Sequence, residues 1–216
     1  MKQHAFAFAR GPERESFAPG AWRLHGRALP VAAELVAAVA QIAEGAPFRH
    51  MTTPGGGRMS AAMTHCGRYG WVTDAAGYRY TEADPISGQD WPDMPQVFRD
   101  LAVAAAHEAG YPAFQPDSCL INRYEPGARM ARHQDRNEGD FAAPIVSVSL
   151  GLPMVFEFGG LRRTDPAQRM VLEHGDVLVW GGPSRLAFHG VLPLRDGLHP
   201  RLGRCRVNLT FRRAGA

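Results

Sequence analysis

The stretch "MARHQDRNEGD" contains a histidine and an aspartate two positions apart, His133 and Asp135. Side chains alternate along an extended chain, so both point to the same side. The motif alone is weak evidence, and a metal ion bound there needs a third ligand, for which we propose His189 in "LAFHGVL". Two imidazoles and one carboxylate form the facial triad of non-haem Fe(II) oxygenases, which leaves positions open for co-substrate and oxygen. A hydrogen-bonded core histidine is the alternative for His189, and His174 and His199 are competing ligands.

The segment "RCRVNLTFRR" alternates polar and apolar side chains. In a strand, one face would carry the apolar residues and the other the polar ones, that is, Val207, Leu209 and Phe211 against Arg206, Asn208, Thr210 and Arg212. Arginines directed into a barrel are costly unless paired, so a short dicarboxylate with one end on Fe(II) would suit them. An edge strand with both arginines in solvent is the alternative. In "INRYEPG", Asn122 and Tyr124 could complete a carboxylate pocket, or simply hydrogen-bond at a strand end.

The composition is that of a globular protein: 216 residues, 45% hydrophobic and 21% charged. No apolar run approaches the roughly 20 residues that span a membrane, so we expect no membrane partner. The beginning of the chain, "MKQHAFAFARGPERE", lacks the features of a secretory signal. Three widely spaced cysteines, Cys66, Cys119 and Cys205, are expected to be reduced core residues in a cytoplasmic protein.

The net charge of +3 does not by itself indicate a nucleic-acid partner. Lys2 is the only lysine, and all other basic residues are arginines. Arginine binds phosphates well because its guanidinium group can donate two parallel hydrogen bonds. A bias in genomic composition explains the same observation equally simply.

Two segments have the pattern of amphipathic helices, residues 30–45 and 94–110. The first has Pro30 at its start, Gly45 just past its end, and one apolar stripe, formed by Leu35, Val39 and Ile42. The second ends at Gly110 by the same rules. We expect both helices to pack on the outside of a β core.

Turn-forming residues and runs of β-branched residues predict the secondary structure of the remaining segments. Residues 1–29 are expected to be irregular or partly stranded, and residues 53–71 to be turn-rich and flexible. After residue 115, short alternating runs are punctuated by Gly, Pro and Asp, which favours a sandwich or barrel. A double-sheet jelly roll is one natural closure of such strands. We therefore expect one catalytic β core, at roughly residues 115–213.

Several long segments together resemble the AlkB family of 2-oxoglutarate-dependent dioxygenases. They run from about Phe48 to Arg213 and include "TPGGGRMSAAMTHCG", "GYPAFQPDSCLINRYEPGA", "HQD", "APIVSVSLGLP", "FGGLRR", "LEHGDVLVWGG" and "RVNLTFR". Residues 1–47 match poorly. The resemblance implies an α+β fold with a double-stranded β-helix (jelly-roll) core, flanking helices and an N-terminal nucleotide-recognition lid. It divides one compact unit into an N-terminal segment (1–47), the lid with a supporting helix (48–114) and the core (115–216).

The resemblance also implies the cofactors and their ligands. Fe(II) would be held by His133, Asp135 and His189. The co-substrate 2-oxoglutarate would be held by Asn122, Arg123, Tyr124, Arg206, Asn208 and Arg212. Arg206 would take the distal carboxylate, and Arg212, near the metal, would count among the catalytic residues.

For the substrate, the resemblance implies a base stacked between Trp71 and His133. The lid would contribute Tyr78, Arg79 and Tyr80, and Arg163 would lie near the target strand. The family has an aspartate two residues after the metal-binding one, where this sequence has Asn137. A minor core role is the alternative for the lid aromatics.

The implied reaction is oxidative demethylation of 1-methyladenine and 3-methylcytosine in DNA, with single strands preferred. The reaction would require Fe(II) as the metal cofactor and would consume 2-oxoglutarate and O₂. The methyl group would leave as formaldehyde. The same chemistry on RNA or protein substrates is the first alternative, and a non-catalytic β-barrel binding module is the second. We expect a monomer.

Overall fold

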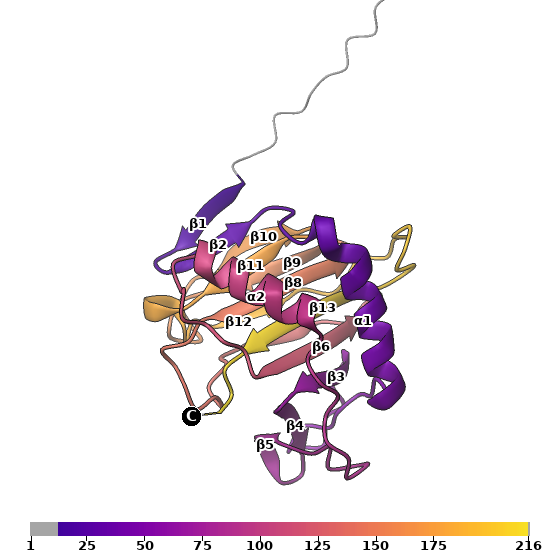
Figure 1. The fold of residues 1–216 in the computed structure, drawn as a ribbon. Helices are drawn as coiled ribbons and strands as arrows, with labels where there is room; N and C mark the ends of the chain where they lie inside the picture. The colour runs from indigo at the N-terminus through magenta and orange to yellow at the C-terminus, as the bar shows by residue number, and fades with distance from the viewer. Residues whose placement is uncertain (1–12, 216) are drawn as a thin grey trace, which may run out of the picture.

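The computed structural model describes residues 13–215, and its strands build two antiparallel sheets plus a separate hairpin (Figure 1). The seven-stranded sheet has the order β1 (Arg14–Ala18), β2 (Ala21–Leu24), β11 (Val177–Trp180), β8 (Ile145–Gly151), β13 (Arg206–Arg212), β6 (Ser118–Tyr124) and β3 (Ala62–Gly67). The four-stranded sheet has the order β10 (Gln168–Leu172), β9 (Met154–Phe158), β12 (His189–Val191) and β7 (Met130–His133). The hairpin joins β4 (Gly70–Asp74) and β5 (Gly77–Thr81). This two-sheet arrangement confirms the predicted jelly-roll fold.

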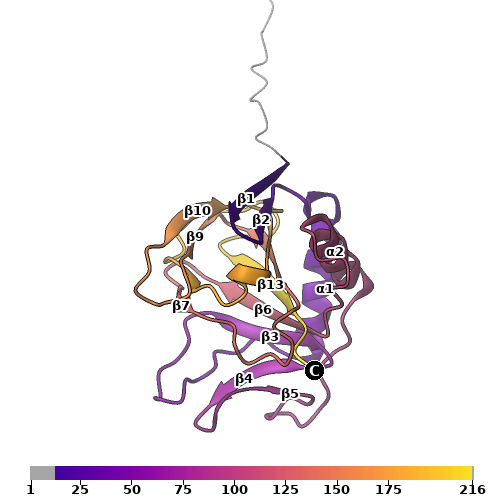
Figure 2. The same ribbon diagram turned by 90° about the vertical axis from the view of Figure 1, so that its left-hand side faces the viewer.

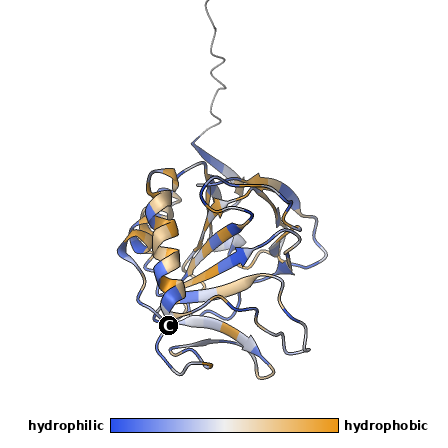
Figure 3. Ribbon diagram, turned by 90° about the vertical axis from the view of Figure 1, so that its right-hand side faces the viewer, coloured by the Kyte–Doolittle hydropathy of each residue, from blue (hydrophilic) through white to orange (hydrophobic). Residues whose placement is uncertain are grey.

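Two helices cover the outer face of the seven-stranded sheet (Figures 1 and 2). They are α1 (Ala32–Gly45), which follows the 3₁₀ turn η1 (Leu29–Val31), and α2 (Gln96–Glu108). The predicted helices and the buried stripe of the first are confirmed, because Leu35, Val39 and Ile42 all lie in the core. Figure 3, seen from the side of α1, shows hydrophobic and hydrophilic residues mixed along that helix, as an amphipathic helix requires. No helix among residues 13–215 is long and apolar enough to span a membrane.

The prediction of a flexible, turn-rich segment over residues 53–71 is wrong for β3. Residues Ala62–Gly67 form a buried strand that pairs along β6, with Thr64 opposite Ile121. The glycines that suggested turns flank this strand, and Gly67 ends it with a positive φ of 98°. The seven-stranded sheet thus draws β1, β2 and β3 from residues before 115, and the three-part division of the chain remains a prediction.

Strand β13 lies in the middle of the seven-stranded sheet, between β8 and β6. The alternative of a solvated edge strand is therefore wrong. Its apolar face packs toward the helices, where Phe98 of α2 meets Phe211 edge-to-face at 5.8 Å between ring centroids. Its polar face is turned toward the four-stranded sheet, so the fold directs both arginines inward.

The three cysteines are free thiols, two of them buried and Cys205 half-buried. The expectation about a secretory signal concerns mainly residues 1–12, which lie outside the described residues.

Candidate metal centre and co-substrate cavity

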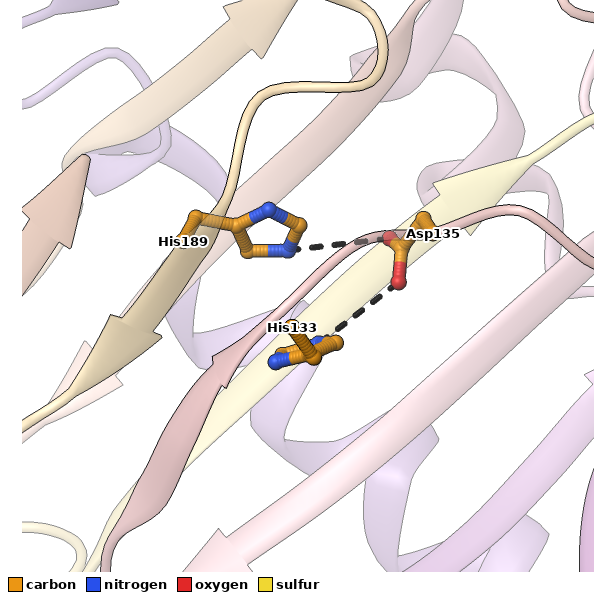
Figure 4. A group of neighbouring side chains, drawn as sticks. All are labelled: His133, Asp135 and His189. Atoms are coloured by element: carbon orange, nitrogen blue, oxygen red, sulfur yellow. Dashed lines mark ion pairs between the residues drawn. The ribbon is translucent and has the colours of Figure 1, made fainter. Parts of the chain in front are cut away.

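His133, Asp135 and His189 meet at one end of the four-stranded sheet (Figure 4). Strand pairing between β7 and β12 sets His133 directly opposite His189, and Asp135 follows two residues beyond the end of β7. One ligand atom from each side chain lies within 4.8 Å of the others. The Nε2 atoms of His133 and His189 are 3.6 Å and 3.8 Å from the Asp135 carboxylate oxygens. The cluster therefore has the composition of a facial triad.

Both histidines have their Nδ1 atoms committed to the backbone. Nδ1–H of His133 donates to the Ala131 carbonyl at 3.0 Å, and Nδ1–H of His189 donates to the Ala187 carbonyl at 3.0 Å. A carbonyl can only accept, so the proton must sit on Nδ1 in each neutral ring. The Nε2 lone pairs are consequently directed to the centre of the cluster, as in histidines that bind metals.

The charge state of the cluster suits a metal ion. Burial alone would raise the pKa of Asp135, but the charges of Arg212 and of the two histidines, with a hydrogen bond from Arg212, hold it below the usual value. Arg212 Nε donates to Asp135 Oδ2 at 2.8 Å. Burial, with a smaller effect of His133, lowers the pKa of His189 to about 4. A carboxylate and a neutral imidazole are the forms that bind metals.

The other histidines proposed as ligands lie elsewhere. His174 and His199 pack against each other with ring centroids 4.5 Å apart. The Gly151 amide donates to Nδ1 of His174, and the Arg201 amide donates to Nδ1 of His199. Among the described residues, only His133, Asp135 and His189 form a group of three or more metal-ligand side chains.

A cavity of about 620 Å³ opens beside the triad, between the two sheets. The polar residues of β13 line it together with Asn122 and Tyr124 of β6. Arg206 is almost fully buried and donates through Nη2 to the Ser149 hydroxyl at 2.8 Å. Its Nε and Nη1, Nη1 of Arg212 and the Asn122 side-chain oxygen are buried without a partner in the described part of the chain. Unpaired buried donors on two arginines fit a bound dianion.

Other residues of this wall are fixed in place by the sheet. Asn208 donates to the Ser147 hydroxyl at 2.8 Å and to the Val148 carbonyl at 2.9 Å, and accepts from Thr210. Burial lowers the pKa of Arg206 to about 10 and raises that of Tyr124 to about 12. At neutral pH this wall therefore keeps a guanidinium cation and an uncharged phenol.

The structure does not bring Arg123 into the cavity. Its neighbours Asn122 and Tyr124 point inward, so alternation along β6 turns Arg123 to the opposite face. There its guanidinium lies over the ring of Phe48, 4.8 Å from the centroid. The role of Arg123 that the family resemblance implied, as a ligand of 2-oxoglutarate, is not supported by this strand geometry.

The β4–β5 hairpin supplies the rim of the cavity. Trp71 and Tyr78 both line the cavity and stack on each other, with centroids 5.6 Å apart and planes inclined by 21°. Trp71 Nε1 donates to the Asn137 side-chain oxygen at 3.3 Å, so the lid touches the loop that carries Asp135. Tyr78 is about half exposed, which leaves its ring accessible from outside.

Two predicted lid residues lie behind this rim. Arg79 makes a paired contact with Asp74, with its two Nη atoms 2.9 Å and 2.8 Å from the carboxylate oxygens. Tyr80 donates its hydroxyl to Glu138 at 2.7 Å. Neither of these two side chains lines the cavity. Arg163 does line it, and it donates to the Arg132 carbonyl at 2.6 Å.

Sequence reasoning missed Arg185 and Ser149. Ser149 was hidden in an apolar run, although its alternation with Ser147 in "IVSVSLG" is a signal for a polar inner face. Arg185 stands alone in a turn, and no sequence pattern indicates that its side chain is buried.

Comparison with known proteins agrees with this geometry. The sequence model of the 2OG-Fe(II) oxygenase superfamily matches residues 24–212. The chain is 55% identical to the alpha-ketoglutarate-dependent dioxygenase AlkB of Escherichia coli (strain K12). The alignment of 204 residues covers 94% of each of the two chains. It is 34% identical over 160 residues to the DNA N(6)-methyladenine demethylase ALKBH1C of Arabidopsis thaliana, covering 62% of this chain and 35% of that relative. The solved structure of OsALKBH1 superposes with a TM-score of 0.80 at 28% identity, covering 93% of this chain and 99% of that one.

Proposed function

Because the chain belongs to the 2OG-Fe(II) oxygenase superfamily and, within it, to the AlkB family, we propose that it removes methyl groups from alkylated bases in DNA. It is a dioxygenase that depends on Fe(II), 2-oxoglutarate and O₂. The alternative of a non-catalytic binding module is therefore wrong. The observation that carries the proposal is the convergence of three ligand atoms on a cavity walled by unpaired arginine donors.

We assign Fe(II) to His133, Asp135 and His189. The donor set supports this assignment, because two imidazole Nε2 atoms and one carboxylate converge within 4.8 Å. When bound, Fe(II) supplies the O₂ chemistry that couples oxidative decarboxylation of 2-oxoglutarate to hydroxylation of a C–H bond. Arg212 keeps Asp135 ionised and restrains its carboxylate through a buried ion pair of 2.7 Å. Arg212 is in this sense a residue of the catalytic machinery.

We assign 2-oxoglutarate to the wall formed by Asn122, Tyr124, Arg206, Asn208 and Arg212. Arg206 offers two unpaired donors and Arg212 offers one. Both guanidinium groups are almost fully buried, so a dicarboxylate would satisfy donors that otherwise remain without partners. Arg206 is the proposed partner of the carboxylate far from the metal, and Arg212 lies next to Asp135.

We assign the methylated base to the space beneath the hairpin, against Trp71, Tyr78, Asn137 and Arg163. The cavity has a size typical of small-molecule sites. The stacked pair of Trp71 and Tyr78 at its mouth, in which Tyr78 is about half exposed, suits stacking on a flipped base. Arg79 would act by stabilising the turn of the hairpin through its ion pair with Asp74. Tyr80 would act by holding the hairpin against the loop of Asp135 through Glu138. The name of the Arabidopsis relative supports methylated DNA as the substrate class.

The finer parts of the proposal are 1-methyladenine and 3-methylcytosine as lesions, and single-stranded DNA as the preferred form. A methylated Watson–Crick edge pairs badly, so extrusion of that base costs less. We also propose a cytoplasmic monomer. The three free thiols support the compartment.

Formaldehyde release tests the proposed function and its alternatives together. The protein is incubated with Fe(II) and with single-stranded DNA, RNA or a peptide, each methylated, in the presence and absence of 2-oxoglutarate. We expect release that depends on 2-oxoglutarate and is fastest with 3-methylcytosine or 1-methyladenine in DNA. Faster release from RNA or from the peptide would overturn the DNA assignment.

A further inference from the structure

The loop between β7 and β8 carries Asp135 but pairs with no strand in the part of the chain that the structure describes. Strand β7 ends at His133 and β8 begins at Ile145. The two histidines are fixed by the pairing of β7 with β12, whereas Asp135 lies beyond the last paired residue. Something other than the sheet must therefore hold the backbone of Asp135 at the correct distance from His189.

Arg185 makes three hydrogen bonds to this loop. Nη1 donates to the Asp135 carbonyl at 2.9 Å, Nε donates to the Ala143 carbonyl at 2.9 Å, and Nη2 donates to the Glu138 carboxylate at 3.2 Å. The three acceptors come from residues 135, 138 and 143, so one guanidinium group is hydrogen-bonded to residues near both ends of the loop. A lysine could not do this, because its ammonium group lacks the planar fork.

Burial makes this contact costly to lose. The side chains of Arg185 and Glu138 are 3% and 2% exposed, and a buried charge must be paired. Glu138 also accepts from Tyr80 of the hairpin and lies 3.4 Å from Nε of Arg212. Arg185 is thus tied to the loop of Asp135 and, through Glu138, to the lid.

The position of Arg185 in the chain links the loop to the third ligand. Arg185 caps the 3₁₀ turn η2 (Gly182–Ser184) and precedes His189 by four residues. Within the same segment, the Leu186 carbonyl accepts from Gln134 at 2.6 Å, and the Ala187 carbonyl accepts from His189 Nδ1. Hydrogen bonds therefore hold the loop that carries Asp135 against the segment that leads to His189.

We propose that Arg185 is a positioning residue of the metal centre, which sets the place of Asp135 relative to His189. This inference rests on the proposed assignment of the metal to the triad. Residues that orient metal ligands typically alter metal affinity by about 10–100-fold when they are lost. Arg185 touches the backbone of Asp135 and not the side-chain ligand atoms, so it acts through the loop.

The test is Mn²⁺ affinity, measured by electron paramagnetic resonance in the absence of 2-oxoglutarate and substrate. The variants are Arg185→Lys and Arg185→Met, with Arg49→Lys as the matched control. Arg49 makes a forked, partly buried ion pair with Asp84, at 2.6 Å and 2.5 Å, and holds a different loop. Thermal unfolding of the metal-free proteins reports how far each change affects the fold.

We expect Arg185→Lys to stay folded and to raise the Kd for Mn²⁺ by at least about tenfold, while Arg49→Lys leaves the Kd within about twofold at a comparable loss of Tm. A Kd for Arg185→Lys within twofold of the parent would overturn the inference. So would an equal rise in Arg49→Lys, or a failure of Arg185→Lys to fold when Arg49→Lys folds. Asp135→Ala distinguishes a failure of the metal assignment from a failure of the proposed role of Arg185. If this variant binds Mn²⁺ as tightly as the parent does, the assignment of the metal to the triad is wrong.

Discussion

His133 and His189 lie directly opposite each other on neighbouring strands, with their ring centroids 4.5 Å apart. One strand register thus brings together two side chains that are 56 positions apart in the sequence. The packing of the seven-stranded sheet against the four-stranded sheet turns the polar face of β13 toward these two histidines. The geometry leads to five predictions.

Arg206→Ala should raise the KM for 2-oxoglutarate at least about tenfold, because a charge-assisted hydrogen bond contributes roughly 1.5–3 kcal/mol. The matched control is Arg123→Ala, since Arg123 lies on the opposite face of the adjacent strand. We expect the control to leave this KM within about twofold. Initial rates at varied 2-oxoglutarate measure both. An equal rise in the two variants would contradict our placement of the co-substrate.

Alternation along the chain predicted the inner face of β13, and the spacing of apolar residues at helical period predicted the buried stripe of α1. The family resemblance implied Arg123 as a ligand of 2-oxoglutarate, but alternation along β6 turns its side chain away from the cavity that Asn122 and Tyr124 line. Strand β3 was missed because its flanking glycines suggested turns. Arg185 was beyond sequence reasoning, since its burial depends on a tertiary contact between two loops.

His65 should make the metal-free protein less stable in acid. Its side chain is fully buried, and neither ring nitrogen has a hydrogen-bond partner within residues 13–215. Burial, with the charge of Arg49, lowers the pKa of His65 to about 3. In the unfolded chain His65 takes up a proton near its ordinary pKa of 6.5, and in the folded protein it does not. Stability therefore falls as the pH drops below that value and keeps falling to about 3.

The size of this loss in the free energy of unfolding follows from the difference between the two pKa values of His65. Between about pH 7.5 and about pH 5.5, His65 should account for about 1 kcal/mol of the loss. Urea unfolding of the parent and of His65→Leu at both pH values, with a chelator present, measures the difference. If the two proteins lose equal stability, the folded protein protonates His65 normally.

Trp71→Ala should weaken turnover of a methylated oligonucleotide by an amount corresponding to about 1–3 kcal/mol, the range for base–aromatic stacking. Decarboxylation of 2-oxoglutarate in the absence of oligonucleotide should change little, because Trp71 lies on the rim and not on the arginine wall. Succinate formation with and without oligonucleotide measures both activities. A parallel loss of the two would indicate that Trp71 supports the fold and not the base.

Asn137→Asp should shift lesion preference toward cationic bases. Asn137 accepts from Trp71 Nε1 at 3.3 Å and lines the cavity, so a carboxylate there would keep this bond and add a negative charge. 3-Methylcytosine is cationic and 3-methylthymine is neutral, and the charge should favour the former by about 1 kcal/mol, or about fivefold. The ratio of kcat/KM values in the same oligonucleotide measures the shift.

A ratio within about twofold of the parent value would contradict the role of Asn137. Glu138 does not replace the charge that Asn137 lacks, because the Glu138 carboxylate is buried and already accepts hydrogen bonds from Tyr80 and Arg185. Asp140 makes an ion pair with Arg213 at 3.6 Å and accepts from the backbone of its own loop.

Asp135→Ala should abolish turnover and also lower stability. Stability should fall because Asp135 is the buried partner of Arg212. Removing one partner of a buried pair costs roughly 3–5 kcal/mol, and Glu138, 3.4 Å from Arg212 Nε, should reduce this cost. Urea unfolding of the metal-free proteins measures the loss.

The central claim is that this one cluster couples 2-oxoglutarate oxidation to demethylation of a base. Succinate and formaldehyde are therefore measured together, with Fe(II) and single-stranded DNA that contains 3-methylcytosine, for the parent and for folded Asp135→Ala. We predict that the parent releases formaldehyde and succinate in near-equal amounts, and that the variant releases neither. Formaldehyde release by the variant at the parental rate, or by the parent without 2-oxoglutarate, would contradict the account.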